Sequence, residues 1–203
     1  MKRFSLFIVF MLLISLCGNA QNAGKAKSIL DTTAGIIGRS GGASANFTVN
    51  SAKYGNVAGT IAIKGNKFQA RTPQSVVWYD GKTQWTYMKK NNEVNISTPN
   101  ESKRLSMNPY TFITMYNRGY NLGVKSIGSN YQVHLTAQNA KNPVQEMYIL
   151  INQRTKVPNE VKMRQGATWT TIHITNFKAK DQSDKLFVFQ SKDYPKAEIV
   201  DLR

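Results

Sequence analysis

Cysteine is nearly absent from this chain, and its absence excludes several kinds of site. The one cysteine among 203 residues is Cys17, which lies in an N-terminal segment that we expect to be removed. A disulfide framework, a thiolate nucleophile and a cysteine-based zinc site all need thiols that the rest of the chain lacks. Histidine is also scarce, because only His134 and His173 are present, so candidate bases and metal ligands are few.

Long apolar runs are absent too, apart from one near the N-terminus. Two basic residues precede an apolar run from Phe4 to Cys17, and Gly18-Asn19-Ala20 offers a cleavage site of small residues. This arrangement is typical of a secretory signal peptide. The run is shorter than the roughly 20 residues that a membrane-spanning helix needs. We therefore predict that residues 1–20 are a cleaved signal peptide and that residues 21–203 form a single soluble, exported domain.

Acidic residues are few, and the chain is strongly basic. It carries 27 Lys and Arg against 11 Asp and Glu; without the two bases of the signal peptide, 25 bases and 11 acids leave a formal charge of +14. Such a charge suits nucleic acid, anionic lipid or an acidic protein. An exported protein meets little nucleic acid and the bases are spread along the chain, so we expect no nucleic-acid partner. Docking onto an acidic partner and simple solubility both remain open as roles for this charge.

Apolar spacing near the start of the mature chain predicts a helix. Apolar and small residues recur every three or four positions from Ile29 to Ile37, and Gly38 then stops the pattern as a helix C-terminus does. The spacing predicts one amphipathic helix over residues 23–37. A second, short helix is predicted near residues 105–118, because an apolar run follows Asn108-Pro109 and ends at Gly119.

The rest of the chain alternates with a period of two, which is typical of strands with one apolar face. The first such run is Ala43 to Val49, turns such as Asp80-Gly81 separate later ones, and Leu186–Phe189 offers a last strand. About eleven strands at close spacing predict a mainly β protein with an antiparallel sheet that forms a barrel or a sandwich. Two helices cannot cover both faces of a large sheet, so we expect them to roof one opening of a curved one.

No catalytic site is predicted. Gly38-Arg39-Ser40-Gly41-Gly42 matches the G-x-S-x-G pattern, but a nucleophile elbow needs a strand before the serine and a helix after it. Here the predicted order is reversed, so a helix cap is the better interpretation. Both histidines share a parity with polar neighbours and are expected to face solvent, and the acids are scattered singly. We expect no enzyme activity, no metal and no cofactor.

Large aromatic and Met side chains are the remaining candidates for a binding site. In a closed sandwich they would form an ordinary packed core, whereas in an incompletely closed barrel the same faces would line a cavity suited to flexible chains. Periodicity alone favours the packed core. The set comprises Trp78, Tyr79, Trp85, Tyr87, Phe112, Met115, Tyr116, Tyr148 and Trp169.

Three adjacent runs carry a family resemblance. The segments Gly59-Thr60-Ile61-Ala62-Ile63-Lys64-Gly65-Asn66-Lys67-Phe68, Val77-Trp78-Tyr79-Asp80-Gly81-Lys82-Thr83-Gln84-Trp85-Thr86-Tyr87 and Glu93-Val94-Asn95-Ile96 resemble the periplasmic lipoprotein carrier family LolA. The resemblance is most specific over residues 57–97. It implies an unclosed antiparallel β-barrel of about eleven strands with a small α-helical lid, and it moves the cavity interpretation ahead of the packed core.

The resemblance also implies a function. Carriers of this family accept acylated lipoproteins from an inner-membrane lipoprotein-releasing transporter, shield the acyl chains and pass them to an outer-membrane acceptor. We accordingly expect a monomeric periplasmic chaperone with acylated lipoproteins as its partners. The sheet side of its cavity is expected to comprise Ile61, Ile63, Phe68, Trp85, Tyr87, Val94 and Ile96, and its lid Ile29, Leu30, Phe112, Met115 and Tyr116.

One departure from the family pattern concerns the latch that holds the lid. The family commonly has an arginine before a proline in the strand that leads to the phenylalanine, whereas this chain has Lys64-Gly65-Asn66-Lys67. Lys64 could give lid carbonyls a single-point hydrogen bond, without the forked geometry of a guanidinium. Two alternatives stay open on the same fold: a lipid-binding regulatory sensor, and a carrier of another amphiphile such as a glycolipid or a lipopolysaccharide fragment.

Overall fold

A computed structural model describes residues 22–52, 55–100, 114–117 and 119–203. The predicted signal peptide, nearly all of the predicted second helix and Phe112 lie outside these residues. Within the described chain, no helix is both long enough and apolar enough to span a bilayer.

The N-terminal helix occupies residues 22–37, as the spacing predicts. Its buried side chains recur at helical intervals and form one stripe: Ala26, Ile29, Leu30, Thr33 and Ile37. The helix ends where the Gly38 N–H donates to the Ala34 carbonyl at 2.7 Å. Gly42 then adopts a φ of 90° as the chain turns into the first strand, a conformation that strongly favours glycine.

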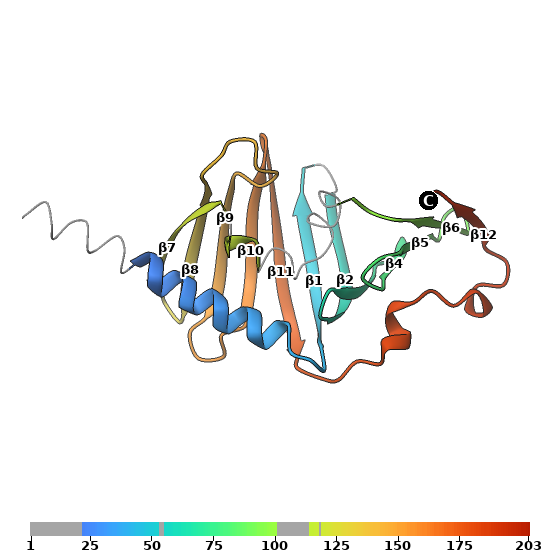
Figure 1. Cartoon of the computed structure of the whole chain (residues 1–203), viewed down its shortest axis with the longest axis horizontal. Coiled ribbons are helices and arrows are strands. Elements are labelled where there is room, and N and C mark those ends of the chain that lie inside the picture. Colours follow the sequence, from blue (N-terminus) through green and yellow to red (C-terminus); the bar gives the residue numbers. More distant parts are fainter. Residues whose placement is uncertain (1–21, 53–54, 101–113, 118) are drawn as a thin grey trace, which may run out of the picture.

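Among the described residues, twelve strands form one continuous open sheet (Figure 1). Their order across the sheet is β12-β6-β5-β4-β3-β2-β1-β11-β10-β9-β8-β7. All neighbours pair antiparallel except β12 and β6, which are parallel. The strands are β1 Ala43–Ser51, β2 Gly55–Lys64, β3 Lys67–Arg71, β4 Ser75–Tyr79, β5 Gln84–Met88, β6 Glu93–Ser97, β7 Tyr120–Ile127, β8 Asn130–Ala137, β9 Glu146–Asn152, β10 Pro158–Gln165, β11 Thr168–Lys178 and β12 Glu198–Asp201.

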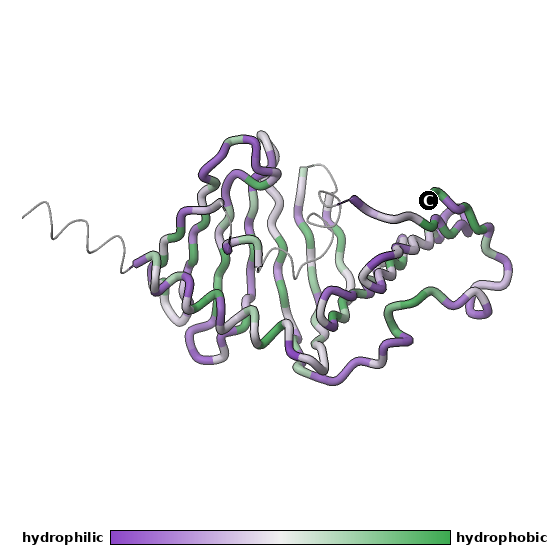
Figure 2. Tube along the Cα trace, viewed as in Figure 1, coloured by the Kyte–Doolittle hydropathy of each residue, from purple (hydrophilic) through white to green (hydrophobic). Residues whose placement is uncertain are grey.

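The end of the chain differs from the prediction. Leu186–Phe189 does not form a strand, because η2, a 3-10 helix, covers Asp184–Phe187. A second short helix, η3, follows at Ser191–Asp193, and β12 is the last strand. Residues 179–203, here called the C-terminal segment, leave β11 in the middle of the sheet and reach its edge beside β6 (Figure 1). The apolar run at η2, visible in Figure 2, therefore packs against the sheet instead of joining it.

The N-terminal helix defines two faces of the sheet. It packs on the inner face, where Ala26, Ile29 and Leu30 join a cluster with Val133 and Leu135 of β8. The C-terminal segment packs on the opposite, outer face at β3 and β4. The protein thus has one covering layer on each face of the sheet, the N-terminal helix on the inner face and the C-terminal segment on the outer face. This arrangement agrees with an open barrel carrying a small helical lid.

Candidate functional site

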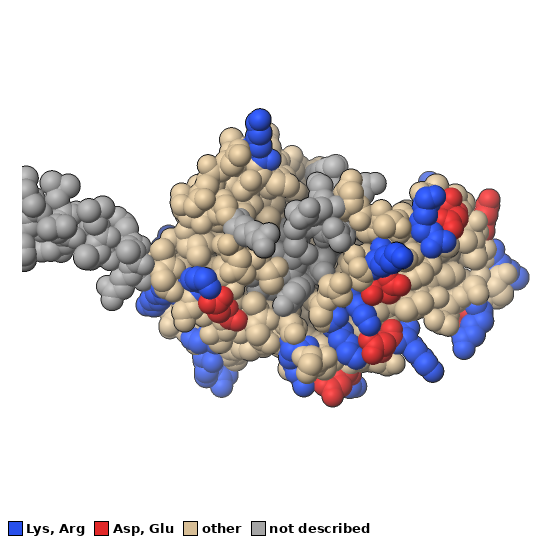
Figure 3. Space-filling view, in the orientation of Figure 1, with Lys and Arg blue, Asp and Glu red and all other residues tan. Residues whose placement is uncertain are grey.

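The inner face is apolar across most of the sheet. One buried cluster joins the first half of the N-terminal helix to β7–β10, and its strand residues include Val133, Met147, Ile149 and Val161. A second joins the end of the helix to β2–β4: Ile37, Ile61, Ile63, Phe68 and Tyr79. Few charged side chains lie over β7–β9 on this side of the molecule, apart from those of the helix (Figure 3).

Between the two clusters, β1 and β11 present apolar side chains that are only partly buried. Phe47 lies opposite Ile174, and Val49 lies opposite Ile172. Val49 also faces Val57 of β2, and all five side chains are of intermediate exposure. The sequence prediction did not place these residues in the site, although the sequence shows apolar and polar residues alternating around them.

A glycine shapes this middle region. Gly59 lies directly opposite Phe47 in the β1–β2 ladder. A Cβ atom at Gly59 would approach the Arg71 carbonyl oxygen and come within 2.7 Å of Phe47 Cζ. Glycine therefore leaves the space that the Phe47 ring occupies over β2.

Side-chain hydrogen bonds fasten the N-terminal helix over the inner face. The Thr33 hydroxyl donates to the Lys156 carbonyl at 3.0 Å, and the Tyr116 hydroxyl donates to Asp31 Oδ1 at 2.5 Å. The Tyr116 bond, aided by Lys27, holds the pKa of the Asp31 carboxyl below its usual value. At the other end of the helix, Asn22 Oδ1 accepts from the Val124 N–H of β7 at 2.9 Å.

Most of the predicted lid residues come together. Ile29 and Leu30 are buried in the first cluster beside Tyr116, and Met115 packs against it. Met115 and Tyr116 belong to η1, a short 3-10 helix at Met115–Asn117. Phe112 lies outside the described residues.

The predicted sheet-side residues divide between the two faces. Ile61, Ile63 and Phe68 point to the inner face with the second cluster. Residues that pair directly in a ladder share a face, and the ladders carry this inner face from Ala70 through Val77 and Thr86 to Asn95. The prediction that Trp85, Tyr87, Val94 and Ile96 line the same surface is therefore wrong in its placement, because alternation puts these four residues on the outer face.

These outer-face residues have a different partner, the C-terminal segment. Trp78 makes edge contacts with Phe189 and Tyr194 at centroid distances of 5.5 Å each, and Tyr87 lies 4.6 Å from Tyr194. The Gln69 amide donates to the Leu186 carbonyl at 2.8 Å. A second hydrophobic layer thus covers the aromatic strands on the side away from the N-terminal helix.

Lys64 also binds the C-terminal segment. Its ammonium group donates to the Gln182 carbonyl at 3.2 Å and pairs with Asp184 at 3.0 Å. Lys67 pairs with the same carboxylate at 2.8 Å. The expected contact with a backbone carbonyl exists, but it lies on the outer face and joins β2 to the C-terminal segment instead of to the N-terminal helix.

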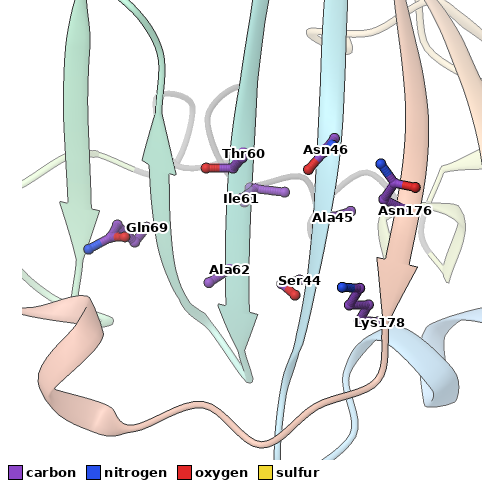
Figure 4. Close-up of a pocket in the computed structure, with 9 residues that line it drawn as sticks. All are labelled: Ser44, Ala45, Asn46, Thr60, Ile61, Ala62, Gln69, Asn176 and Lys178. Atoms are coloured by element: carbon purple, nitrogen blue, oxygen red, sulfur yellow. The ribbon is translucent and has the colours of Figure 1, made fainter.

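The outer face holds a polar groove of about 440 Å³ over β1, β2, β3 and β11 (Figure 4). A β-bulge between Ser44 and Asn46 opens the ladder there, and Asn176 opposite it adopts a φ of 52°. Hydroxyl, amide and ammonium groups line much of the groove, including Thr60, Gln69 and Lys178. Such a lining does not suit acyl chains, because burial of polar groups without partners is costly.

The two histidines, predicted to face solvent, lie on the outer face, where His173 is exposed and His134 is partly exposed. His134 stacks on Tyr148 at 4.3 Å and pairs with Glu146 at 3.0 Å, and His173 pairs with Glu160 at 3.3 Å. Hydrogen bonds from Tyr148, His134 and Arg164, with Tyr148 contributing most, lower the pKa of Glu146. Ser40 is exposed in the turn between the helix and β1. Among the described residues, no three His, Asp or Glu side chains gather to hold a metal ion.

Three solved structures resemble this chain, and the first of them supports the same fold. An uncharacterized conserved protein from Thermus thermophilus matches with a TM-score of 0.57 and 13% identity, over 87% of this chain and 99% of its own. A LolA superfamily protein from Nitrosomonas europaea matches at 0.46 and 13%, over 81% and 97%. A putative outer membrane lipoprotein-sorting protein domain from Vibrio parahaemolyticus matches at 0.44 and 10%, over 86% and 98%.

No curated protein matches the sequence. A family model described as "Outer membrane lipoprotein carrier protein LolA" matches residues 16–167, which include the N-terminal helix, the inner-face residues of β1–β4 and the strands β5–β10. With an open sheet, an apolar inner face and a helix packed across it, the chain belongs to the LolA family of outer membrane lipoprotein carrier proteins.

Proposed function

We propose that this protein is a periplasmic chaperone that binds the acyl chains of lipoproteins on its inner face. It would receive them from an inner-membrane transporter and deliver them to an outer-membrane acceptor, without covalent chemistry. The observation that carries the proposal is the apolar strip of β1, β2 and β11, where Phe47, Val49, Val57, Ile172 and Ile174 are only partly buried. This strip connects two fully buried clusters on the same face.

The energetics support such a task. Burial of an acyl chain is worth about 0.8 kcal/mol per CH₂ group, so each long chain contributes on the order of ten kcal/mol. Unassisted release into water would be very slow. A carrier needs a weaker site, and a strip of side chains already half shielded by protein gains less on binding than fully exposed ones would.

Adjacent residues of β1 provide a matched test. Val49 faces the strip, whereas Thr48 is exposed on the outer face opposite His173. Val49→Glu would place a carboxylate among acyl chains and should abolish the binding of a fluorescent fatty-acyl probe, because burial of an unpaired charge is very costly. Thr48→Glu should bind the probe as the wild type does. Equal binding by both variants would exclude the inner face as the acyl site.

The cargo itself can be identified directly. The mature protein, purified without detergent from the periplasm of its host, should give a native mass spectrum with the added mass of one acylated lipoprotein. A glycolipid adduct instead would retain the inner face as the acyl-binding surface and change the cargo. The salt dependence of binding then separates recognition of a charged headgroup from burial of acyl chains. Ionic contacts weaken as the Debye length falls from about 10 Å at 0.1 M to about 3 Å at 1 M, whereas acyl burial does not.

A further inference from the structure

The β7 edge of the sheet has backbone groups that face outward. The Gln138 N–H donates to the Gly119 carbonyl, and hydrogen-bonded pairs alternate along an antiparallel ladder. The backbone groups of Asn121 and Gly123 therefore point to β8, and those of Tyr120, Leu122 and Val124 point away from the sheet. The bond from the Val124 N–H to Asn22 confirms this orientation.

The described residues occupy only part of this edge. Asn22 at the start of the N-terminal helix takes the Val124 N–H. Within the described residues, the Leu122 N–H and carbonyl have no hydrogen-bond partner. Outward N–H and C=O groups at every second residue are a template for another extended chain.

A groove of about 400 Å³ lies beside these free groups. Tyr120, Asn121 and Leu122 form one wall, and Ala23, Gly24 and Lys27 of the N-terminal helix form the other. The two helix residues nearest the N-terminus are small, and a Cβ at Gly24 would meet nothing within 4 Å. The groove is thus open alongside the strand edge.

The groove is continuous with the inner face. Tyr120 is buried in the first apolar cluster, and Leu122 packs against it. A ligand whose acyl chains lie on the inner face could therefore continue into the groove without crossing solvent. In a lipoprotein the acyl chains and the start of the polypeptide are carried by the same residue, so the polypeptide must leave the acyl site within a few residues.

We propose that the groove between β7 and the N-terminal helix binds the extended polypeptide that follows the acylated residue of the cargo. The cargo would add a short strand to the β7 edge at Tyr120 and Leu122. Backbone hydrogen bonds do not depend on side-chain identity, so one edge could accept lipoproteins of different sequence. This inference rests on the proposed function and adds a second, polypeptide subsite to it.

Two glycines of the helix allow a controlled test. Gly24 lines the groove, whereas Gly35 lies near the other end of the helix, and neither would bring a Cβ into contact with its surroundings. Gly24→Phe should fill the groove, and Gly35→Phe should leave it open. Both changes replace an exposed helical glycine, so effects on helix propensity are matched.

Three ligands separate the two subsites: a diacylglyceryl cysteine without a tail, the same group with a ten-residue polar peptide tail, and that lipopeptide with an N-methylated tail. Two strand hydrogen bonds, each in the lower part of the usual range of net strength, correspond to about tenfold in affinity. The wild type and Gly35→Phe should bind the tailed ligand about tenfold more tightly than the other two. Gly24→Phe should bind all three alike, with the affinity that the wild type has for the tailless ligand.

A second measurement does not depend on any variant. The Leu122 amide should gain protection from hydrogen exchange when the tailed lipopeptide binds the wild-type protein, and not when the tailless ligand binds. If tailed and tailless ligands bind with equal affinity and Leu122 remains unprotected, the polypeptide subsite is refuted while acyl binding stands. If no diacyl ligand binds, the proposed function fails and this inference fails with it.

Discussion

Phe187 is the residue on which attachment of the C-terminal segment should depend most. It lies in η2, which packs against β3 and β4, and its side chain is 0% exposed. Truncation of a fully buried phenylalanine to alanine costs about 3–5 kcal/mol, because transfer energy is lost and a cavity remains. That is a large fraction of the 5–15 kcal/mol typical of folded domains.

Phe187→Ala should therefore lower the melting temperature by about 6–20 °C, since about 2–4 °C per kcal/mol applies to a chain of this size. The free energy of unfolding in urea measures the loss directly. Val188→Ala is the control: its side chain is only partly buried, so about 1 kcal/mol is expected. A loss for Phe187→Ala no larger than that of the control would refute the view that this ring anchors the segment.

The site of the change can be followed as well. Trp78 contacts Phe189 and Tyr194 of the C-terminal segment. In a background with Trp85→Phe and Trp169→Phe, detachment of the segment should shift the emission of Trp78 to longer wavelength. If the segment detaches as a unit, this shift precedes the loss of β-sheet circular dichroism, whereas simultaneous changes would indicate one cooperative domain.

Two further predictions concern the sheet. Gly59→Ala should destabilise the protein by about 1–3 kcal/mol in urea unfolding, because the added methyl would meet Phe47 and the Arg71 carbonyl. The control, Gly123→Ala, places its methyl in open space on β7 and should be neutral or slightly stabilising. Equal losses of stability in the two variants would contradict the steric argument. Glu146 has a pKa below its usual value of 4.5 in the folded state, so it stabilises the fold above that value and the contribution is lost as pH falls through the folded pKa. In Glu146→Gln, the free energy of unfolding should fall less steeply below about pH 5 than it does in the wild type. An unchanged slope would show that this carboxylate does not contribute to the pH dependence of stability.

Local alternation identified most of the strands and the N-terminal helix. The predicted helix at residues 23–37 and the alternation of Phe47, Val133 and Ile172 correspond to real elements. These features are set by side chains close in sequence, since an apolar face of period two or 3.6 must be buried somewhere. The strand β12 is short and pairs with β6 about a hundred residues earlier, so no local pattern indicated it.

Which face each apolar set occupies could not be read from alternation alone. The prediction assumed that the largest side chains on every strand face the same interior. Tyr79 pairs with Gln84 across the Asp80-Gly81 turn, and this register puts Trp85 on the face opposite Tyr79. On the outer face of β4 and β5, the C-terminal segment adds a hydrophobic layer over Trp78 and Tyr87. Only that tertiary contact explains aromatic residues on the outer face.

The central position of the β1–β11 pair has a consequence for the order of folding. Two meanders, β1–β6 and β7–β11, each consist of neighbours in sequence, and they meet only where β1 pairs with β11. In that ladder Val49 lies opposite Ile172, so β1 cannot pair with β11 until residues more than a hundred positions later have been synthesised. Pairings of such long sequence separation are slow to form. We expect each meander to expose its apolar face before the halves join, which makes the nascent chain dependent on protection from aggregation.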